Sequence, residues 1–230
     1  MLDAKRDLLL AISDELRTPL TRARLNAELL AEDADTAPTG AALLRDLAQM
    51  RDLITDLLES ERLASRHAAL QREATDLPAL AHALIGDMAA LRAAAADVPV
   101  HVAPSLTAPL WLDAGRTRLL LRNLLDNALR HTPTGAAPPE LHLGVADNGH
   151  VLIEVRDHGP GVPPEQLARL TEAFYRPDDA RQRSTGGVGL GLYLARMVAE
   201  AHGGRLTVRD AQPGLAVRAE WPAAAVPAES

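Results

Sequence analysis

Apolar residues recur at helical spacing along the first part of the chain. One stripe runs through residues 3–32, and a second steps by four, three, four and three through residues 43–57, as a heptad seam does. Between them lies a polar stretch with Pro38 and Gly40, which favour a turn. The pattern predicts an antiparallel hairpin of two helices. Because a lone hairpin leaves its apolar stripe uncovered, we expect a dimeric four-helix bundle; the alternative is a monomeric hairpin packed on the rest of its own chain.

The pattern changes further along the chain. Helical periodicity predicts helices over residues 78–96, 116–130 and 191–202. Strand patterns cover residues 98–103, 110–113, 141–145, 151–156, 205–209 and 215–221. The turn sequence Asp147-Asn148-Gly149 separates two of these strands and predicts a β-hairpin. Helices on one face of a mixed sheet would make an α+β sandwich.

These patterns divide the chain into four segments. The helical hairpin occupies residues 1–67, and a linker follows over residues 68–75. A second domain is predicted over residues 76–222, and residues 223–230, rich in Ala and Pro, are expected to form a disordered tail. A length of 230 residues is enough for one ordinary domain and a smaller module.

Composition narrows the classes of function. A net charge of -7 provides no general basic field, which argues against nucleic-acid binding. The absence of cysteine excludes disulfides and thiolate metal sites, and the eight histidines show no spacing that indicates a metal site. No apolar run approaches the roughly 20 residues of a membrane-spanning helix, so we expect no membrane contact by this chain.

A glycine-rich segment, Ser184-Thr-Gly-Gly-Val-Gly189-Leu-Gly191-Leu, precedes the last predicted helix. Glycines let the main chain approach a polyphosphate, and a helix N-terminus offers free N–H donors. The segment is not a Rossmann fingerprint, because no strand leads directly into it, nor a Walker A loop, because no Lys-Ser/Thr pair follows. Lys5 is the one lysine of the chain, so phosphate contacts are expected from arginine, main chain or a metal.

Two further segments carry polar residues in patterns suited to nucleotide chemistry. Asn123, Asn127 and Arg130 recur at i, i+4 and i+7 and so share one face of a predicted helix, where an amide oxygen suits Mg²⁺. The alternative for this face is a solvated polar stripe. Asp157 ends a predicted strand and is followed by a loop with two glycines, where a carboxylate can accept the amino group of a base such as adenine.

Together and in this order, these three segments resemble the N, G1 and G2 boxes of the histidine kinase ATP-binding domain. That domain is of the GHKL, or Bergerat, type shared with gyrase, Hsp90 and MutL. The segment Glu172-Ala-Phe174-Tyr175-Arg176 is similar to its F box. The resemblance implies that ATP or ADP binds with Mg²⁺ on Asn127 and adenine on Asp157, and that residues 176–187 form a mobile lid. The nucleotide-binding residues it implies are Asn123, Asn127, Arg130, His131, Asp157, Gly159, Gly161, Phe174, Arg176, Gly187, Gly189, Leu190 and Gly191.

Residues 11–22, Ala-Ile-Ser-Asp-Glu-Leu-Arg-Thr-Pro-Leu-Thr-Arg, resemble the phospho-acceptor helix of two-component sensor histidine kinases, whose motif is S-H-E-L-R-T-P-L. Asp14 stands where the family has its phosphorylated histidine. By this resemblance Glu15 would orient or deprotonate the acceptor, and Thr18 would help place water for dephosphorylating a response regulator. A carboxylate is a weaker nucleophile than neutral imidazole, and Asp14 puts like charge beside Glu15. We therefore expect ATP binding to survive and autophosphorylation at Asp14 to be lost.

The resemblance covers nearly all of residues 3–221 and implies the cytoplasmic catalytic core of a sensor histidine kinase. Such a core would be a homodimer that serves a cognate response regulator, within a parent anchored in the inner membrane. Two alternatives stay open. One is a regulator whose bundle docks a response regulator and uses Thr18 as a phosphatase, with nucleotide setting its conformation. The other is a GHKL ATPase unrelated to signalling, which the E-L-R-T-P-L segment disfavours.

Overall fold

The computed structural model describes residues 69–177 and 189–224 and, in the N-terminal part of the chain, residues 20, 21, 23–28, 30, 39, 40, 43, 44, 47, 50, 54, 55 and 58. The chain divides into two compact units, Met1–Ser65 and Arg66–Ser230. Across the described residues, no helix combines the length and the apolar character that crossing a membrane requires.

The described residues of the first unit are all helical, in agreement with their helical periodicity. Arg24 Nε and Glu28 Oε1, one helical turn apart, lie 2.8 Å from each other and form an ion pair. Thr39 and Gly40 are also helical, so the prediction that the turn extends through Gly40 was wrong. Glycine within a helix is only about 1 kcal/mol less favourable than alanine. Gly40 is buried.

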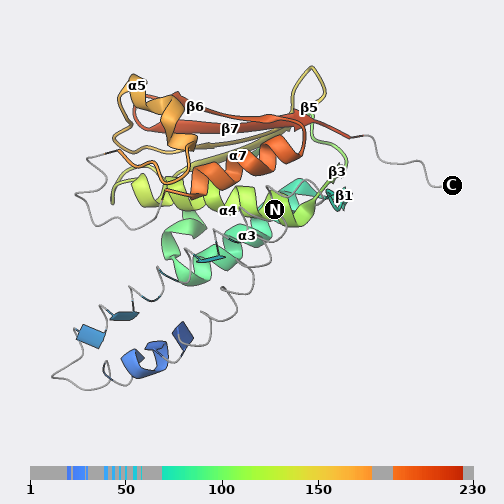
Figure 1. Cartoon of the computed structure of the whole chain (residues 1–230). Helices are drawn as coiled ribbons and strands as arrows, with labels where there is room; N and C mark the ends of the chain where they lie inside the picture. Colours follow the sequence, from blue (N-terminus) through green and yellow to red (C-terminus); the bar gives the residue numbers. More distant parts are fainter. Residues whose placement is uncertain are drawn as a thin grey trace, which may run out of the picture. The chain divides into compact units, whose positions relative to one another are not determined.

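A five-stranded mixed sheet forms the centre of the second unit (Figure 1). β2 and β4 are parallel, and every other pair of neighbours is antiparallel. The predicted hairpin joins β4 to β5, and Gly149 in its turn has a φ of 75°, which glycine adopts without steric strain. In spatial order the strands are β2 (Val100–Val102), β4 (Glu140–Val145), β5 (His150–Arg156), β7 (Leu215–Pro222) and β6 (Arg205–Asp210).

Helices cover one face of this sheet, as the sequence predicted (Figure 1). α4 (Ala114–His131) and α7 (Gly191–Ala201) pack on each other and on the sheet, and α3 (Leu77–Leu91) packs beside α4 and β2. The core lies between these layers, because alternate residues of each strand and one stripe of each helix are apolar. Its largest fully buried side chains include Leu120, Leu121, Leu124 and Leu125 of α4, Val151 and Ile153 of β5, Leu194 of α7 and Trp221 of β7.

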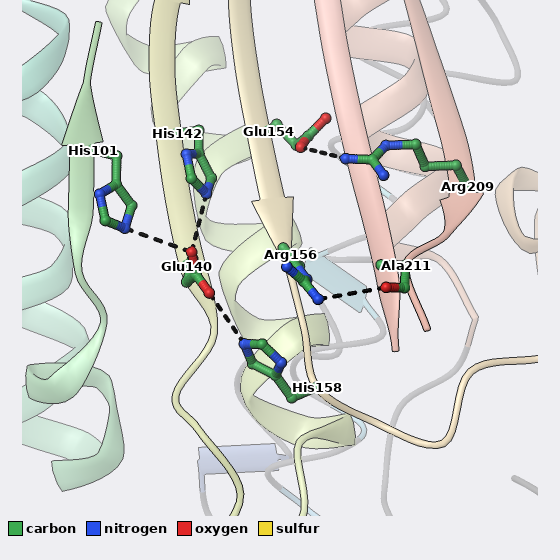
Figure 2. A network of polar contacts seen from close by, with 8 residues as sticks. All are labelled: His101, Glu140, His142, Glu154, Arg156, His158, Arg209 and Ala211. Carbon is green, nitrogen blue, oxygen red and sulfur yellow. Dashed lines mark hydrogen bonds and ion pairs between the residues drawn. The ribbon is translucent and has the colours of Figure 1, made fainter. Parts of the chain in front are cut away.

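The opposite face of the sheet carries polar side chains (Figure 2). Glu154 of β5 accepts hydrogen bonds from Arg209 Nη2 at 2.9 Å and from Arg218 Nε at 2.7 Å, so it links three strands. Glu154 is only 7% exposed, and burial by itself raises the pKa of its carboxyl. The two guanidinium groups have the larger combined effect, so the pKa is lowered. This charge is therefore held on a face that the helices leave uncovered.

The stretch predicted as a linker contains a strand. β1 (Glu73–Thr75) pairs antiparallel with β3 (Leu110–Leu112) in a separate two-stranded sheet. A strand of three residues is too short to show a period of two, so the sequence pattern could not reveal it. At the other end of the unit, Ala224 forms a bridge with Trp111, so the main chain is held at least to this residue of the expected tail.

Helix α3 ends at Leu91, not at residue 96 as the periodicity predicted. Arg92 is extended, with φ −145° and ψ 98°, and its guanidinium donates to Leu129 O at 2.7 Å. The following residues form a short 3₁₀ helix, η1 (Ala93–Asp97). A tertiary hydrogen bond to α4 thus overrides the high helix propensity of the alanines that follow. Two further short helices, α5 (Pro164–Leu167) and η2 (Ala168–Thr171), precede the F-box segment.

A buried histidine joins the ends of two helices. His202, 4% exposed, follows α7, and its Nδ1 donates to Val198 O at 2.9 Å. Its Nε2 accepts the main-chain N–H of Asp113 at 3.3 Å, and the Asp113 carboxylate caps α4 by accepting from Arg116 N. Burial lowers the pKa of His202, against the opposing effects of the Val198 carbonyl and Asp113. The ring is therefore held neutral, in the tautomer that satisfies both main-chain partners.

The neutral state of His202 predicts a pH dependence of stability. The unfolded chain takes up a proton near pH 6.5, the usual pKa of histidine, whereas the folded chain resists it. The stabilisation of the fold by neutral His202 is therefore complete above pH 6.5 and is lost as the pH falls. The free energy of unfolding then decreases by at most about 1.4 kcal/mol per pH unit. We expect His202→Gln to reduce the loss of unfolding free energy between pH 7.5 and pH 5.5. Urea titrations at each pH measure this free energy of unfolding. Tryptophan fluorescence reports on the second unit, because that unit contains both tryptophans.

His82→Gln is the matched control, because this histidine lies exposed on α3. The control should keep the pH dependence of the unaltered chain. If His202→Gln and His82→Gln show the same dependence as that chain, His202 is not the group that titrates.

Candidate nucleotide-binding site

Asp157 lies at the end of β5 and is 3% exposed. Its Oδ1 accepts two main-chain hydrogen bonds, from Gly159 N at 2.8 Å and from Leu215 N at 3.1 Å. Burial raises the pKa of this carboxyl, while the two main-chain donors and the nearby His131 and His158 act in the opposite direction. Because both donors occupy one oxygen, the plane of the carboxylate is fixed. A fixed buried acceptor of this kind can select a ligand by its hydrogen-bond donors.

Two glycines allow the main chain to pass close to Asp157 and to the end of α4. A Cβ atom on Gly159 would lie 2.7 Å from His131 O and 3.0 Å from Asp157 Oδ1. A Cβ atom on Gly214, in the turn between β6 and β7, would lie 2.5 Å from Asp157 Oδ1. Only glycine fits at either position. The predicted G1 segment is therefore clamped between the end of α4 and the β6–β7 turn.

The start of α7 meets the asparagine face of α4. Asn123 Nδ2 donates to Leu119 O at 2.9 Å, which leaves its Oδ1 directed toward Gly191, where a Cβ atom would lie 3.2 Å away. Leu190 precedes the helix and its side chain makes no capping hydrogen bond. Leu190 thus supplies no acceptor for the first N–H groups of α7, and N–H groups at a helix N-terminus suit an anion such as a phosphate.

The F-box and G2 segments are in direct main-chain contact. Phe174 N donates to Gly189 O at 2.9 Å, and a Cβ atom on Gly189 would lie 2.7 Å from Tyr175 O. Gly189 has a φ of 80°, and Phe174 has a φ of 63°, which is unusual for a residue with a bulky side chain. Phe174 is 56% exposed, so its aromatic ring is not part of the core.

The structure brings together most of the residues implied by the sequence. Helix α4 carries Asn123, Asn127, Arg130 and His131. Close approaches at Gly159 and Gly191 join this helix to the Asp157 loop and to α7. A third close approach, at Gly189, joins the F box to the G2 segment. Asn127 is half-buried one turn from Asn123, and Arg130 Nη2 lies 3.7 Å from Asp126 Oδ2. Gly161 has a φ of 69°, as its place in the glycine loop requires. Gly187 and the acceptor-segment residues Asp14, Glu15 and Thr18 lie outside the described residues, as does most of the predicted lid.

The sequence analysis missed two contributors to the site, Gly214 and Leu215. Gly214 in the β6–β7 turn and Leu215 at the start of β7 contact Asp157 from 57 and 58 residues further along the chain. The Gln-Pro-Gly sequence before β7 indicates a tight turn, but it gives no sign of which carboxylate the turn will contact.

Two family models match the chain. Residues 4–66 match the His Kinase A (phospho-acceptor) domain, and residues 112–225 match the histidine kinase-, DNA gyrase B- and HSP90-like ATPase. Sensor protein RstB of Escherichia coli is 34% identical over 96% of this chain and 50% of RstB. Sensor histidine kinase MtrB of Mycolicibacterium paratuberculosis is 34% identical over 89% of this chain and 36% of MtrB. The crystal structure of full-length ShkA in complex with AMPPNP matches with a TM-score of 0.75 and 29% identity, covering 96% of this chain and 47% of ShkA.

The fold and the site thus define an ATP-binding domain of the histidine kinase, gyrase B and HSP90 class. With a phospho-acceptor domain before it, the chain belongs to the histidine kinase family and corresponds to the catalytic core of a two-component sensor histidine kinase. The chain spans half or less of the length of the two curated relatives named above.

The close approach at Gly159 predicts the effect of a single methyl group. In Gly159→Ala the new Cβ would meet a main-chain carbonyl, so the Asp157 loop must shift. We expect nucleotide affinity to fall by about tenfold or more, equivalent to about 1.4 kcal/mol. Displacement of a fluorescent ADP analogue measures it.

Gly86→Ala is the matched control, because Gly86 lies within α3 and a Cβ atom there has no neighbour within 4 Å. The control should bind nucleotide like the unaltered chain and gain about 0.5–1 kcal/mol in stability. Equal affinities for the two variants would contradict the role given to the glycine loop.

Proposed function

We propose that this chain binds ATP with Mg²⁺ as a sensor histidine kinase core does, and that Asp14 prevents it from autophosphorylating at the usual position. Nucleotide binding is inferred from the buried carboxylate of Asp157, which two main-chain N–H donors fix and which Gly159 and Gly214 flank. The observation that carries the second part is the aspartate within an otherwise matching acceptor motif.

The residues around the site have distinct roles in this proposal. Asp157, when ionised, accepts the exocyclic amino group of adenine. The N-terminus of α7 and the glycines that precede it hold the phosphates, together with Arg130. Oxygen ligands suit Mg²⁺, and Asn127 supplies an amide oxygen beside the phosphate end, where Mg²⁺ would offset the charge of the triphosphate.

The first unit supports a dimer. Ala27 and Leu47 are buried within one copy, whereas Leu25, Leu43 and Met50 are 54%, 37% and 48% exposed. Leu43 and Met50 belong to the predicted heptad seam, and apolar side chains repeated along one seam are stabilised by covering them. We infer that a second copy covers them in a four-helix bundle, which the phospho-acceptor family model also favours.

The chemistry of Asp14 explains why we expect no stable phosphoprotein. A carboxylate carries a full negative charge toward an incoming triphosphate, which is also negative. Its side chain is shorter than that of histidine, and an acyl phosphate formed on it is readily hydrolysed. Glu15 would add a second like charge beside it. The kinase machinery would therefore lack an acceptor rather than a nucleotide.

Labelling with γ-phosphoryl-labelled ATP and Mg²⁺ tests this proposal. The unaltered chain and Asp14→His are treated side by side, and we expect only Asp14→His to acquire an acid-labile, base-stable label. The imidazole restores a neutral nucleophile at that position. Asp14→His combined with Asp157→Asn is the control and should lose the label together with nucleotide affinity. Stable label on the unaltered chain would overturn the view that Asp14 disables autophosphorylation.

A second function is favoured by the spacing of Glu15 and Thr18, which keeps the pattern E-x-x-T although the acceptor is changed. Such a chain can act as a response-regulator phosphatase, with nucleotide controlling its conformation. We expect Thr18→Ala to lower the rate of dephosphorylation of a phosphorylated cognate regulator by about a hundredfold, as is typical when a reacting group is misplaced. Release of phosphate from the labelled regulator measures it, and an unchanged rate would reject this function.

The relatives also suggest the setting of the chain. Because it spans only part of RstB and MtrB, we propose that it is the cytoplasmic core of a longer, inner-membrane sensor and that a cognate response regulator is its partner. The negative net charge gives no support to a nucleic-acid partner.

A further inference from the structure

Three histidines surround one glutamate on the sheet face that the helices leave uncovered (Figure 2). His101 of β2 is the register partner of His142 of β4, and Glu140 lies two residues before His142 on the same strand. Residues two apart on a strand point to the same face. The parallel pairing of β2 and β4 therefore places the two imidazoles and the carboxylate side by side, although His101 and His142 are far apart in sequence.

The distances between these groups suit a metal ion. His142 Nε2 lies 3.3 Å and His101 Nε2 lies 3.6 Å from the same oxygen, Glu140 Oε2. Ligand atoms of all three residues lie within 4.8 Å of one another. Zinc ligands at about 2.0–2.1 Å in a tetrahedron are separated by about 3.3–3.4 Å. The two N–O separations are thus close to the edge of such a tetrahedron. Because the two rings are stacked and each imidazole binds a metal in its own plane, at least one ring would rotate when both bind one ion.

A third histidine orients the carboxylate. His158 Nε2 lies 3.2 Å from the other oxygen, Glu140 Oε1, and the side chain of His158 is only 14% exposed. Carboxylates that bind metals commonly have their second oxygen held by a hydrogen bond, which fixes the direction of the first. The other carboxylate oxygen, Glu140 Oε2, is thereby directed toward His142 and His101.

The two imidazoles form one wall of an open hollow. Their rings stack with centroids 4.6 Å apart and planes inclined by 18°. Both are accessible, His101 being 51% and His142 40% exposed, so an ion can reach them from solvent. The hollow that they line together with Gly144 and Leu152 leaves room for water on the outer side. A site with three protein ligands and water is a common arrangement for zinc.

We propose that His101, Glu140 and His142 form a binding site for one divalent ion of the late first-row transition metals, such as Zn²⁺, with His158 as the positioning residue for Glu140. Two imidazoles and one carboxylate favour Zn²⁺, Ni²⁺ or Cu²⁺ over Mg²⁺ and Ca²⁺, which prefer oxygen ligands alone. Metal binding at this site does not rest on the proposed kinase function, whereas its coupling to nucleotide rests on the proposed nucleotide binding.

The position of His158 gives the site a connection to nucleotide binding. This histidine stands between Asp157 and Gly159, so it belongs to the loop that holds the adenine-binding carboxylate. An ion on Glu140 would hold the Glu140–His158 pair and, through it, the start of that loop. Metal binding is therefore expected to alter nucleotide affinity, and nucleotide would alter metal affinity by the same factor.

Titration of the full chain with Zn²⁺ tests the proposal. The tag-free, chelator-treated chain competes with a chromophoric chelator for Zn²⁺, and Co²⁺ is used as a spectroscopic probe. We expect one equivalent to bind and Co²⁺ to give the intense visible absorption of a tetrahedral or five-coordinate ion. His101→Ala and His142→Ala should each lose that equivalent. His158→Ala should retain it with about 10- to 100-fold weaker affinity, as is typical when an outer hydrogen bond to a ligand is removed.

His82→Ala is the matched control, since this exposed histidine lies on α3, away from the cluster. It should bind Zn²⁺ like the unaltered chain. Far-ultraviolet circular dichroism, measured on each variant, verifies that the domain is folded. No bound equivalent in the unaltered chain, or an equivalent retained by both His101→Ala and His142→Ala, would overturn the proposal and leave only a cluster of ion pairs.

Discussion

The ATP-binding unit depends on one buried carboxylate. Asp157 ends the central strand β5, and its Oδ1 binds the main chain of its own loop and of β7. A buried charge is tolerated only when hydrogen bonds replace its hydration, so this arrangement fixes the loop and the neighbouring turn together. Gly159 and Gly214 are required because any side chain there would occupy the space beside that carboxylate. The geometry of the nucleotide site follows from satisfying this single group.

The two faces of the sheet have different roles. The helix-covered face carries Leu, Ile and Val and makes the core, and His202 and Asp113 hold the ends of α4 and α7 on it. The uncovered face carries charges that satisfy one another, such as Glu154 with Arg209 and Arg218. Asp157 and His158 follow β5 directly and are consecutive in the chain, so the buried carboxylate of the candidate site and the histidine beside Glu140 are one residue apart. A change in the position of one of these two residues can thus displace the other directly.

Much of the fold was predictable from sequence because periodicity is a local property. The hairpin around Gly149 and the helices α4 and α7 were found where apolar spacing and turn residues placed them. The strand β1 and the end of α3 at Leu91 were not, because pairing with β3 and the Arg92–Leu129 hydrogen bond are tertiary effects. In the site, Asp157 was identified from its glycine loop, but Gly214 and Leu215 were not. The histidine cluster was missed for the same reason, since His101 and His142 meet only through strand register.

The glycines of the site also determine which of its parts mutation can alter. Around Asp157 and at the start of α7, the glycine segments contribute main-chain N–H and C=O groups to the candidate site, and every amino acid except proline possesses both groups. A substitution can obstruct these groups by adding atoms, but it cannot remove them. A small inhibitor that took its hydrogen bonds from them would leave the protein few routes to resistance. A substitution bulky enough to exclude the inhibitor would also exclude the nucleotide.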